Sequence, residues 1–366
     1  MALDAPRVSI VMFCRDRHET VARAVDSILA QTYPHVEIVV QDGASTDGTL
    51  EILRGYGDRV RLVSEPDAGP GEGFLRALRR CTGELMGSCL SDETLVPDAV
   101  ERAVRAFKAD PQRDGVTGDG NQVDLAGRPL GTHVGSPFDL VRYMAGEHFP
   151  YFVSSFFRRQ TLEALGIMAD ADDLEGLEFK IWVRLGLHGE IAYVPGVFGN
   201  YALHAGQLSN TPRTIITNIA MRSRILEDLF RPGAPFAGTG EDFTSLRLAL
   251  LVRNQVCFYN HAVVAGLPDV AEHAFRRMHA LGRELVSHLM MRADGTAALG
   301  PAVTARALLG ARIPVNDPDP GTVRPARVAL PPIEPALFGI VARTFEAMGR
   351  PEKARTCRLQ GGLDPA

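Results

Sequence analysis

Three aspartates in the first third of the chain each follow a short apolar run. They are Asp42 after residues 36–40, Asp67 after residues 60–63 and Asp92 after residues 85–90. The runs are rich in β-branched residues and alternate with amphipathic stretches, which indicates a parallel sheet with crossover helices. Ligands of such sheets bind beyond the carboxyl ends of the strands, so we expect the three carboxylates at one edge. Short acids at that edge can accept hydrogen bonds from the N–H and hydroxyl groups of a ligand.

The same residue types also have a purely structural explanation. An aspartate beside a glycine favours a turn, and this interpretation applies to Asp42 and Asp67. The acidic pair Asp92 and Glu93 would in that case cap the helix that follows it. Asp47 lies in a Ser/Thr/Asp cluster, where we predict that it caps a short helix.

The elements that would position these acids follow from the same patterns. A first strand is expected at residues 8–13, and Asp16 with Glu19 fits a capping box that opens a crossover helix. The later predicted elements are helices near residues 74–80 and from 97, a strand near 116–118, a hairpin at 127–129, helices at 159–165 and 177–187, and extended chain at 191–201. We expect the sheet to become mixed after residue 116.

Length and charge both divide the chain into two regions. Its 366 residues are about 2.4 times a typical domain of ~150 residues. Residues 1–210 carry 20 basic and 30 acidic side chains, and residues 211–366 carry 19 and 14, which gives net charges of −10 and +5. The acidic first region is a poor surface for nucleic acid, whereas the basic second region suits an anionic partner such as a lipid surface. Residues 213–310 are expected to be mostly helical, followed by a Pro-rich loop at 314–333 and one last helix.

Composition excludes several other classes of protein. With 45% hydrophobic and 23% charged residues, the chain is typical of a folded protein. No apolar run approaches the ~20 residues of a membrane span, and residues 1–7 do not read as a signal peptide, so we expect a soluble, cytoplasmic protein. Five scattered cysteines indicate reduced thiols, without a disulfide framework or a zinc site.

Taken in order, several segments resemble the family 2 glycosyltransferases, which are inverting enzymes with the GT-A fold. The resembling segments are residues 8–11 with 26–34, 42–49, 65–69, 90–97, 156–159, 178–185 and 201–209. The pairing of the first strand and helix with the Asp-Gly-x-Ser-x-Asp-Gly-Thr turn at 42–49 is highly specific. The resemblance covers roughly residues 6–212. It implies a Rossmann-like, mostly parallel mixed sheet with flanking helices, so the fold class is α/β.

This resemblance implies a domain organisation as well. Residues 1–212 would form the GT-A catalytic domain, with a nucleotide half at about 1–118 and an acceptor half at about 119–212. Residues 213–366 would form a mainly α-helical C-terminal region. That region could pack on the catalytic domain, form a homo-oligomer or provide peripheral membrane contact.

Individual residues of the donor site are also implied by the resemblance. The expected nucleotide-sugar contacts are Asp42, Asp67, Ser91 and Asp92, of which the first two would bind the base and the ribose. A sugar nucleotide carries a diphosphate whose charge grows as the glycosidic bond breaks, so Mg²⁺ or Mn²⁺ would stabilise the leaving group as a Lewis acid. Asp92, Glu93 and His204 are the expected ligands of this cation. Glu93 departs from the family pattern, which usually has an aspartate at this position.

The acceptor side requires one general base that takes the proton of the attacking hydroxyl. Glu178 is the candidate, because it stands where the family has an aspartate before an aromatic-rich helix. The nearby acids Asp172, Asp173 and Glu175 compete for this role, and an acid in the first turn of a helix can simply favour the helix dipole. Trp182 and Arg158 are candidates for acceptor or phosphate contacts, with core packing as the alternative for Trp182.

The resemblance therefore implies a metal-dependent inverting glycosyltransferase. It would move a sugar from a nucleoside-diphosphate sugar, with UDP favoured, to a hydroxyl group of a glycan, lipid-linked or other acceptor. Bacterial surface polysaccharide or glycolipid synthesis is the expected setting.

Three other functions compete with this one. A catalytically inactive glycosyltransferase-like protein that binds sugars or acts as a scaffold would tolerate glutamate at positions 93 and 178. The glycine-rich loop at residues 69–73 imitates the dinucleotide fingerprint of an NAD-dependent oxidoreductase, although Phe74 stands where the third glycine belongs. A nucleotidylyltransferase would need an early Gly-rich, basic loop for a triphosphate, and the sequence has none.

Overall fold

The computed structural model describes residues 4–169, 176–204, 206–207, 211–237, 244–291 and 335–364. The chain divides into two compact units. Unit 1 comprises Met1–Phe138 and Pro150–Gln207, and unit 2 comprises Asp139–Phe149 and Leu208–Ala366. The sequence predicted a single boundary after residue 212, whereas the structure also assigns the short segment 139–149 to unit 2.

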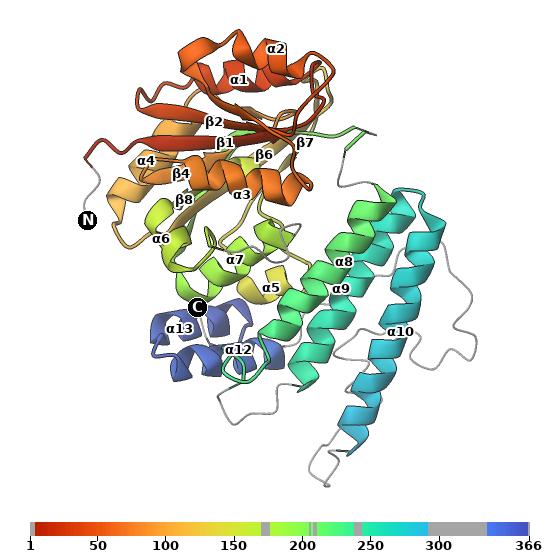
Figure 1. The fold of residues 1–366 in the computed structure, drawn as a ribbon. Helices are drawn as coiled ribbons and strands as arrows, with labels where there is room; N and C mark the ends of the chain where they lie inside the picture. The colour runs from red at the N-terminus through yellow and green to blue at the C-terminus, as the bar shows by residue number, and fades with distance from the viewer. Residues whose placement is uncertain are drawn as a thin grey trace. The chain divides into compact units, whose positions relative to one another are not determined.

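Unit 1 is built on one mixed sheet (Figure 1). Its first strands, β1 (Val8–Cys14), β2 (Val36–Asp42), β3 (Arg61–Ser64) and β4 (Leu85–Ser88), pair in parallel. The later strands are β5 (Thr94–Leu95), β6 (Gly115–Val123), β7 (Pro129–His133), β8 (Ser155–Arg158) and β9 (Ile191–Ala202). The strand order is β3-β2-β1-β4-β8-β6-β9-β5, with β7 on β6. Because β8 is antiparallel to β4 and β6, the predicted change to a mixed sheet is confirmed.

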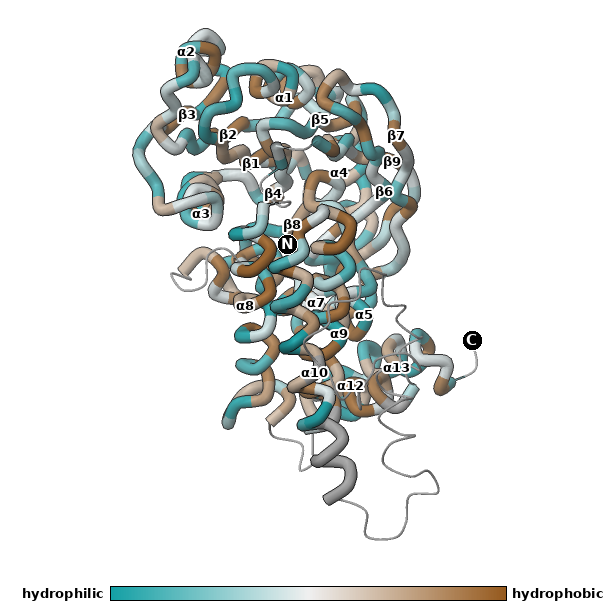
Figure 2. The backbone as a smooth tube through the Cα atoms, turned by 90° about the vertical axis from the view of Figure 1, so that its right-hand side faces the viewer, coloured by the Kyte–Doolittle hydropathy of each residue, from teal (hydrophilic) through white to brown (hydrophobic). Residues whose placement is uncertain are grey.

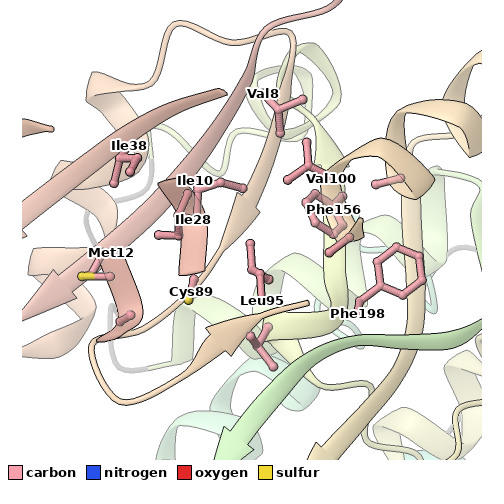
Figure 3. Packing of buried hydrophobic residues seen from close by; sticks show 14 of the residues in the cluster. Val8, Ile10, Met12, Ile28, Ile38, Cys89, Leu95, Val100, Phe156 and Phe198 are labelled. Carbon is pink, nitrogen blue, oxygen red and sulfur yellow. The ribbon is translucent and has the colours of Figure 1, made fainter. Parts of the chain in front are cut away.

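Helices cover both faces of this sheet. They are α1 (Val21–Leu29), α2 (Thr49–Arg54), α3 (Pro70–Arg80), α4 (Ala99–Ala109), α6 (Arg159–Ala164) and α7 (Leu177–His188), with 3₁₀ turns at Gly57–Arg59 and Phe152–Ser154. Figure 1 shows α1 and α3 on opposite sides of β1 and β2. Apolar residues of β1, α1 and α4 form a buried core, in which Figure 3 shows Ile10, Ile28 and Val100. This core fixes the strands whose carboxyl ends carry the predicted acids.

The loop after β1 differs from its predicted form. Helix α1 begins at Val21, and no side chain caps its first turn. Asp16 instead lies in the left-handed region with φ 53°, and its carboxylate accepts a hydrogen bond from the N–H of Thr46 at 2.9 Å. The capping box predicted from Asp16 and Glu19 is therefore wrong, because contacts with the loop after β2 determine this conformation.

Unit 2 is helical. Its helices are α5 (Leu140–Met144), α8 (Pro212–Asp228), α9 (Thr244–Val264), α10 (Pro268–Met291), α12 (Pro335–Ala347) and α13 (Pro351–Gln360). Helices α8, α9 and α10 lie side by side, and Figure 2 shows hydrophobic and hydrophilic stretches alternating along α8 and α10, as expected for helices that bury one face. The last helix predicted from the sequence is two helices, because the chain turns at Gly349, with φ 70°, before Pro351 opens α13. The predicted Pro-rich loop lies outside the described residues.

Two buried contacts explain why the segment 139–149 belongs to unit 2. The side-chain amide of Asn254 on α9 donates a hydrogen bond to the carbonyl of Met144 at 2.6 Å. Arg253, which is completely buried, forms an ion pair with Glu147. Among the helices that the structure describes, none is both long and apolar enough to cross a membrane.

Candidate functional site

Asp42 is fully buried at the end of β2 and is surrounded by hydrogen-bond donors. The parallel register places Cys14 on one side of it and Ser64 on the other. The hydroxyl of Ser64 donates to its Oδ2 at 2.6 Å, and the N–H of Ser45 donates to the same atom at 3.0 Å. The hydroxyl of Ser45 and the thiol of Cys14 donate to Oδ1. The carboxylate is therefore held in one orientation.

The thiol of Cys14 is a donor in this arrangement. Burial and the negative charge of Asp42 hold the pKa of Cys14 well above its usual value, so the thiol keeps its proton. The sequence analysis missed Cys14, Ser45 and Ser64 as partners of Asp42. The strand register joins Cys14 and Ser64 to Asp42, and no local motif reports that register, whereas Ser45 lies three residues away in the turn at 42–49.

Asp67 lies in a slot formed by two glycines. A Cβ atom on Gly43 would lie 2.9 Å from Oδ2 of Asp67, and a Cβ atom on Gly73 would lie 3.0 Å from the same oxygen. The N–H of Gly69 donates to Oδ1 at 3.1 Å, and Gly69 has φ 137°, which favours glycine. The structure thus places Asp67 against the residue that follows Asp42, at the same edge of the sheet.

The glycine-rich loop at residues 69–73 opens α3 but lacks the features of a dinucleotide site. Glu72 lies in the first turn of α3, where a pyrophosphate would bind. Its carboxylate accepts a hydrogen bond from the N–H of Ala68 at 2.6 Å and pairs with Arg76 at 2.6 Å. A negative charge fixed at this helix terminus argues against the oxidoreductase alternative.

Asp92 and His204 meet although they are far apart in the sequence. Oδ2 of Asp92 lies 3.1 Å from Nε2 of His204, and both side chains are half-buried. Ser91 is buried beside Asp92. The carboxylate oxygen is a ligand that Mn²⁺ and Mg²⁺ prefer, and the imidazole nitrogen at this distance could bind the same divalent cation.

Glu93, the third predicted ligand, is held inside its own turn. Its Oε2 accepts a hydrogen bond from the N–H of Leu90 at 2.8 Å, and the side chain is almost fully buried. Burial raises the pKa of Glu93 to about 8; the N–H of Leu90 opposes this rise, and the charges of Asp92 and Glu178 add to it. In the part of the chain that the structure describes, no three His, Cys, Asp or Glu side chains form a metal site.

Glu178 is exposed in the first turn of α7. Its negative charge adds to the raised pKa of Glu93 in the loop after β4. The competing acids Asp172, Asp173 and Glu175 lie outside the described residues.

Trp182 does not face the site. It is completely buried, its ring stacks on Phe138 at 5.3 Å between centroids, and Phe157 meets it edge-on at 5.2 Å. The predicted sugar or phosphate contact at Trp182 is corrected to core packing, the alternative given above. Its place one turn after Glu178 on α7 makes it an anchor for that helix.

Arg158 lies at the opposite edge of the sheet. It pairs with Leu85 at the start of β4, whereas Asp92 follows the end of that strand. Its guanidinium donates hydrogen bonds to the carbonyls of Arg113 and Pro111. The predicted phosphate or acceptor contact at Arg158 is therefore replaced by a structural role.

Asp47 lies one residue before Gly48, the N-cap of α2, so it bonds the first N–H of this helix without being the predicted cap residue. Its Oδ1 accepts a hydrogen bond from the N–H of Thr49 at 3.0 Å, at the start of α2. Its Oδ2 accepts from the N–H of His18 at 3.0 Å. Asp47 therefore joins the loops after β1 and β2, which surround the buried Asp42.

Residues 9–166 match the family model described as glycosyl transferase family 2. This segment is a family 2 glycosyltransferase domain. The match contains the acids Asp42, Asp67 and Asp92, whereas Glu178 and His204 lie beyond it.

Two curated relatives of this domain are polysaccharide synthases. The chain is 26% identical to the chondroitin synthase of Escherichia coli over 209 residues, which cover 56% of this chain and 30% of the relative. It is 25% identical to the hyaluronan synthase of Pasteurella multocida over 209 residues, covering 56% and 21%. The chain thus spans less than a third of the length of these relatives.

A solved structure extends the likeness in fold to nearly the whole chain. S. aureus TarS, residues 1–349, in complex with UDP-GlcNAc, has a TM-score of 0.56 at 14% sequence identity, covering 97% of this chain and 91% of that one. This likeness supports the predicted fold, a GT-A sheet followed by a helical region.

Proposed function

We propose that the chain is an inverting glycosyltransferase that moves a sugar from a nucleoside-diphosphate sugar to a hydroxyl group. The observation that carries this proposal is that Asp42, Asp67 and Asp92 each lie at or just beyond the carboxyl end of a parallel strand of one sheet, with Asp67 against the residue after Asp42. UDP is the favoured nucleotide, because TarS, which has a similar fold, binds UDP-GlcNAc. The names of the chondroitin and hyaluronan synthases support a polysaccharide acceptor.

Asp42 and Asp67 would recognise the base and the ribose. A carboxylate that neighbouring donors already hold in one orientation loses little conformational entropy when it binds a ligand. Asp42 has such an orientation, and because the donors around it are protein groups, a nucleotide N–H would replace one serine hydroxyl. Asp67 lies beside it in the slot between Gly43 and Gly73.

Asp92 and His204 fit a divalent cation of the Mn²⁺ or Mg²⁺ type. They supply one oxygen and one nitrogen ligand, and cations of this kind commonly complete their coordination with substrate phosphates and water. When bound, the cation would neutralise charge on the diphosphate leaving group. Glu93 would support this site by fixing the turn that carries Asp92.

Glu178 would act as the general base. It is exposed at the start of α7, so its carboxylate can accept a proton from an acceptor hydroxyl as the new bond forms. The buried ring of Trp182 would keep the helix in place while this happens.

A thermal-shift panel tests the donor site. UDP, GDP, dTDP and NAD(H) are each added with and without Mn²⁺, and saturation at ~100 times Kd should stabilise the protein by about 2.7 kcal/mol. We expect a shift with UDP that requires Mn²⁺ and disappears in Asp92→Asn. A shift with NAD(H) alone would contradict the proposal. A UDP shift without any sugar transfer would favour the inactive, sugar-binding alternative.

A further inference from the structure

A row of uncharged polar side chains crosses the second half of the unit 1 sheet. It consists of Thr94 on β5, Asn200 on β9, Asn121 on β6 and Thr132 on β7, which the strand register places side by side. Nδ2 of Asn200 donates to the hydroxyl of Thr94 at 2.8 Å, and Nδ2 of Asn121 donates to Oδ1 of Asn200 at 3.0 Å. The hydroxyl of Thr132 donates to Oδ1 of Asn121 at 3.0 Å. We name these four residues the Asn–Thr row.

The row keeps hydrogen-bonding capacity for a ligand. A side-chain amide has two N–H donors and an oxygen with two lone pairs. The bonds within the row use one donor and one lone pair of Asn121 and of Asn200. All four residues are half-buried or exposed. A donor and an acceptor next to each other suit a hydroxyl group, which both donates and accepts.

The row begins at the proposed transfer site. Thr94 is two residues from Asp92, so their Cα atoms are at most ~7 Å apart. Strand β9 leads from Asn200 towards His204, whose ring contacts Asp92 at 3.1 Å. From Thr94 the row crosses three strand spacings, ~14 Å in all, to Thr132. It therefore leads from β5, which follows the proposed metal ligand Asp92, across β9 and β6 to the hairpin strand β7.

The two faces of these strands differ in character. Leu95 and Tyr201, which alternate with residues of the row, pack on the hydrophobic core. On β7, Leu130 has the spacing that places it on the same face as Thr132 and is 57% exposed, and Val134, just after the strand, is 71% exposed. The row thus combines uncharged polar side chains with exposed apolar neighbours. A saccharide fits it, because its hydroxyl groups can bind amides and its C–H groups can pack on apolar side chains.

We propose that the Asn–Thr row is the subsite that binds the saccharide chain of the acceptor. The sugar that receives the new bond lies at the Thr94 end, and the rest of the chain extends towards Thr132, Leu130 and Val134. The inference rests on the proposed function, since it names the acceptor of that reaction. The absence of charged groups from the row favours the hydroxyl groups of a saccharide over a phosphate headgroup.

Titrations with defined saccharides test this subsite. Chitotetraose, cellotetraose and a chondroitin tetrasaccharide are added to the full chain with UDP and Mn²⁺, and binding is measured by saturation-transfer difference NMR. We expect at least one of them to bind, and Asn121→Ala and Thr132→Val each to raise its Kd about tenfold. The matched control is Gln122→Ala on the same strand. Gln122 lies on the other face, where its side-chain amide donates a hydrogen bond to the hydroxyl of Tyr151 at 2.7 Å. The Kd of this variant for the saccharide should therefore equal that of the wild type.

Two results overturn the subsite. One is an unchanged Kd in both row variants, and the other is a wild-type protein that binds none of the three saccharides. The UDP thermal shift of the same samples is read separately, so a missing donor site is distinguished from a missing acceptor subsite. Should Asn121→Ala fail to fold, the exposed Thr132→Val decides the question.

Discussion

The acids of this site differ in burial, and they therefore differ in the chemistry that they can perform. Asp42 is fully buried and accepts hydrogen bonds from fixed protein donors, so it can only serve as an oriented acceptor. Glu178 is exposed on the first turn of a helix, where water and an acceptor hydroxyl can reach it. Binding and proton transfer therefore belong to different residues, and each can be tested alone.

Replacing Glu178 by glutamine should stop proton transfer and leave the donor site intact. Because glutamine has nearly the same shape but cannot take a proton, we expect kcat to fall by roughly 10² to 10⁴. The Kd for UDP with Mn²⁺ should not change. Steady-state kinetics and thermal shifts measure the two quantities, and a turnover within twofold of wild type would assign the base to another acid.

The glycine slot around Asp67 predicts a sensitive position. In Gly43→Ala, the new Cβ would lie 2.9 Å from the Asp67 carboxylate, which must then move. We expect the Kd for UDP to rise about tenfold, while the fold is retained. Gly131→Ala is the control, because its Cβ would have no contact shorter than 3.4 Å. Equal UDP affinity in both variants would show that Asp67 does not bind the nucleotide.

The helices and strands with a clear pattern of hydrophobic residues could be predicted from the sequence. Those that depend on contacts with distant residues could not. The apolar run at residues 8–13 predicts β1 because a buried strand has that composition. Strand β5 has two residues and exists only because Thr94 pairs with Asn200 on β9. Helical spacing places Glu178 and Trp182 on one face of α7, but it could not show that aromatic neighbours bury Trp182.

The residues of the candidate site also divide into those predicted from local patterns and those that depend on distant contacts. The acids at the strand ends could be predicted, because the carboxyl edge of a parallel sheet collects whatever follows each strand. The donors of Asp42 could not, because Cys14 and Ser64 reach it only through the register of three strands. Nor could the inward turn of Glu93, which depends on a single N–H three residues away.

Asp119 predicts how the sheet responds to acid. It accepts hydrogen bonds from the hydroxyl of Tyr193 at 2.6 Å and from the N–H groups of Gly135 and Gly196 at 2.7 Å each. Burial opposes ionisation, but these bonds outweigh it and lower the pKa of Asp119. Its contribution to stability is thus fully present above the unfolded-state value of ~3.9 and is lost as the pH falls through the lower folded value.

Urea unfolding of Asp119→Asn measures this contribution. Near neutral pH the variant should be less stable than wild type, and below about pH 4 the difference should shrink. Asp58→Asn, at an exposed position, is the control and should show little difference at either pH. A difference that stays constant with pH would mean that the charge of Asp119 does not stabilise the sheet.

At the scale of the whole molecule, the chain leaves the sheet unit and returns to it. The segment Asp139–Phe149 belongs to the helical unit, so it divides the sequence of unit 1 into two parts. The ion pair between Glu147 and the buried Arg253 lies within unit 2.

The sequence has a single tryptophan, Trp182, which lies in the core of unit 1. Tryptophan fluorescence therefore reports on unit 1, whereas far-UV circular dichroism reports on helices of both units.

Glu147→Gln should separate these two signals. Removing one partner of a buried ion pair costs about 3–5 kcal/mol, and we expect the lower end because Glu147 is 22% exposed. The circular dichroism transition in urea should move to lower concentration, while the fluorescence transition of Trp182 should stay in place. Glu346→Gln, which breaks a more exposed pair with Arg358 in the same unit, should shift neither transition appreciably. If both signals of Glu147→Gln moved together, the two units would unfold as one cooperative body.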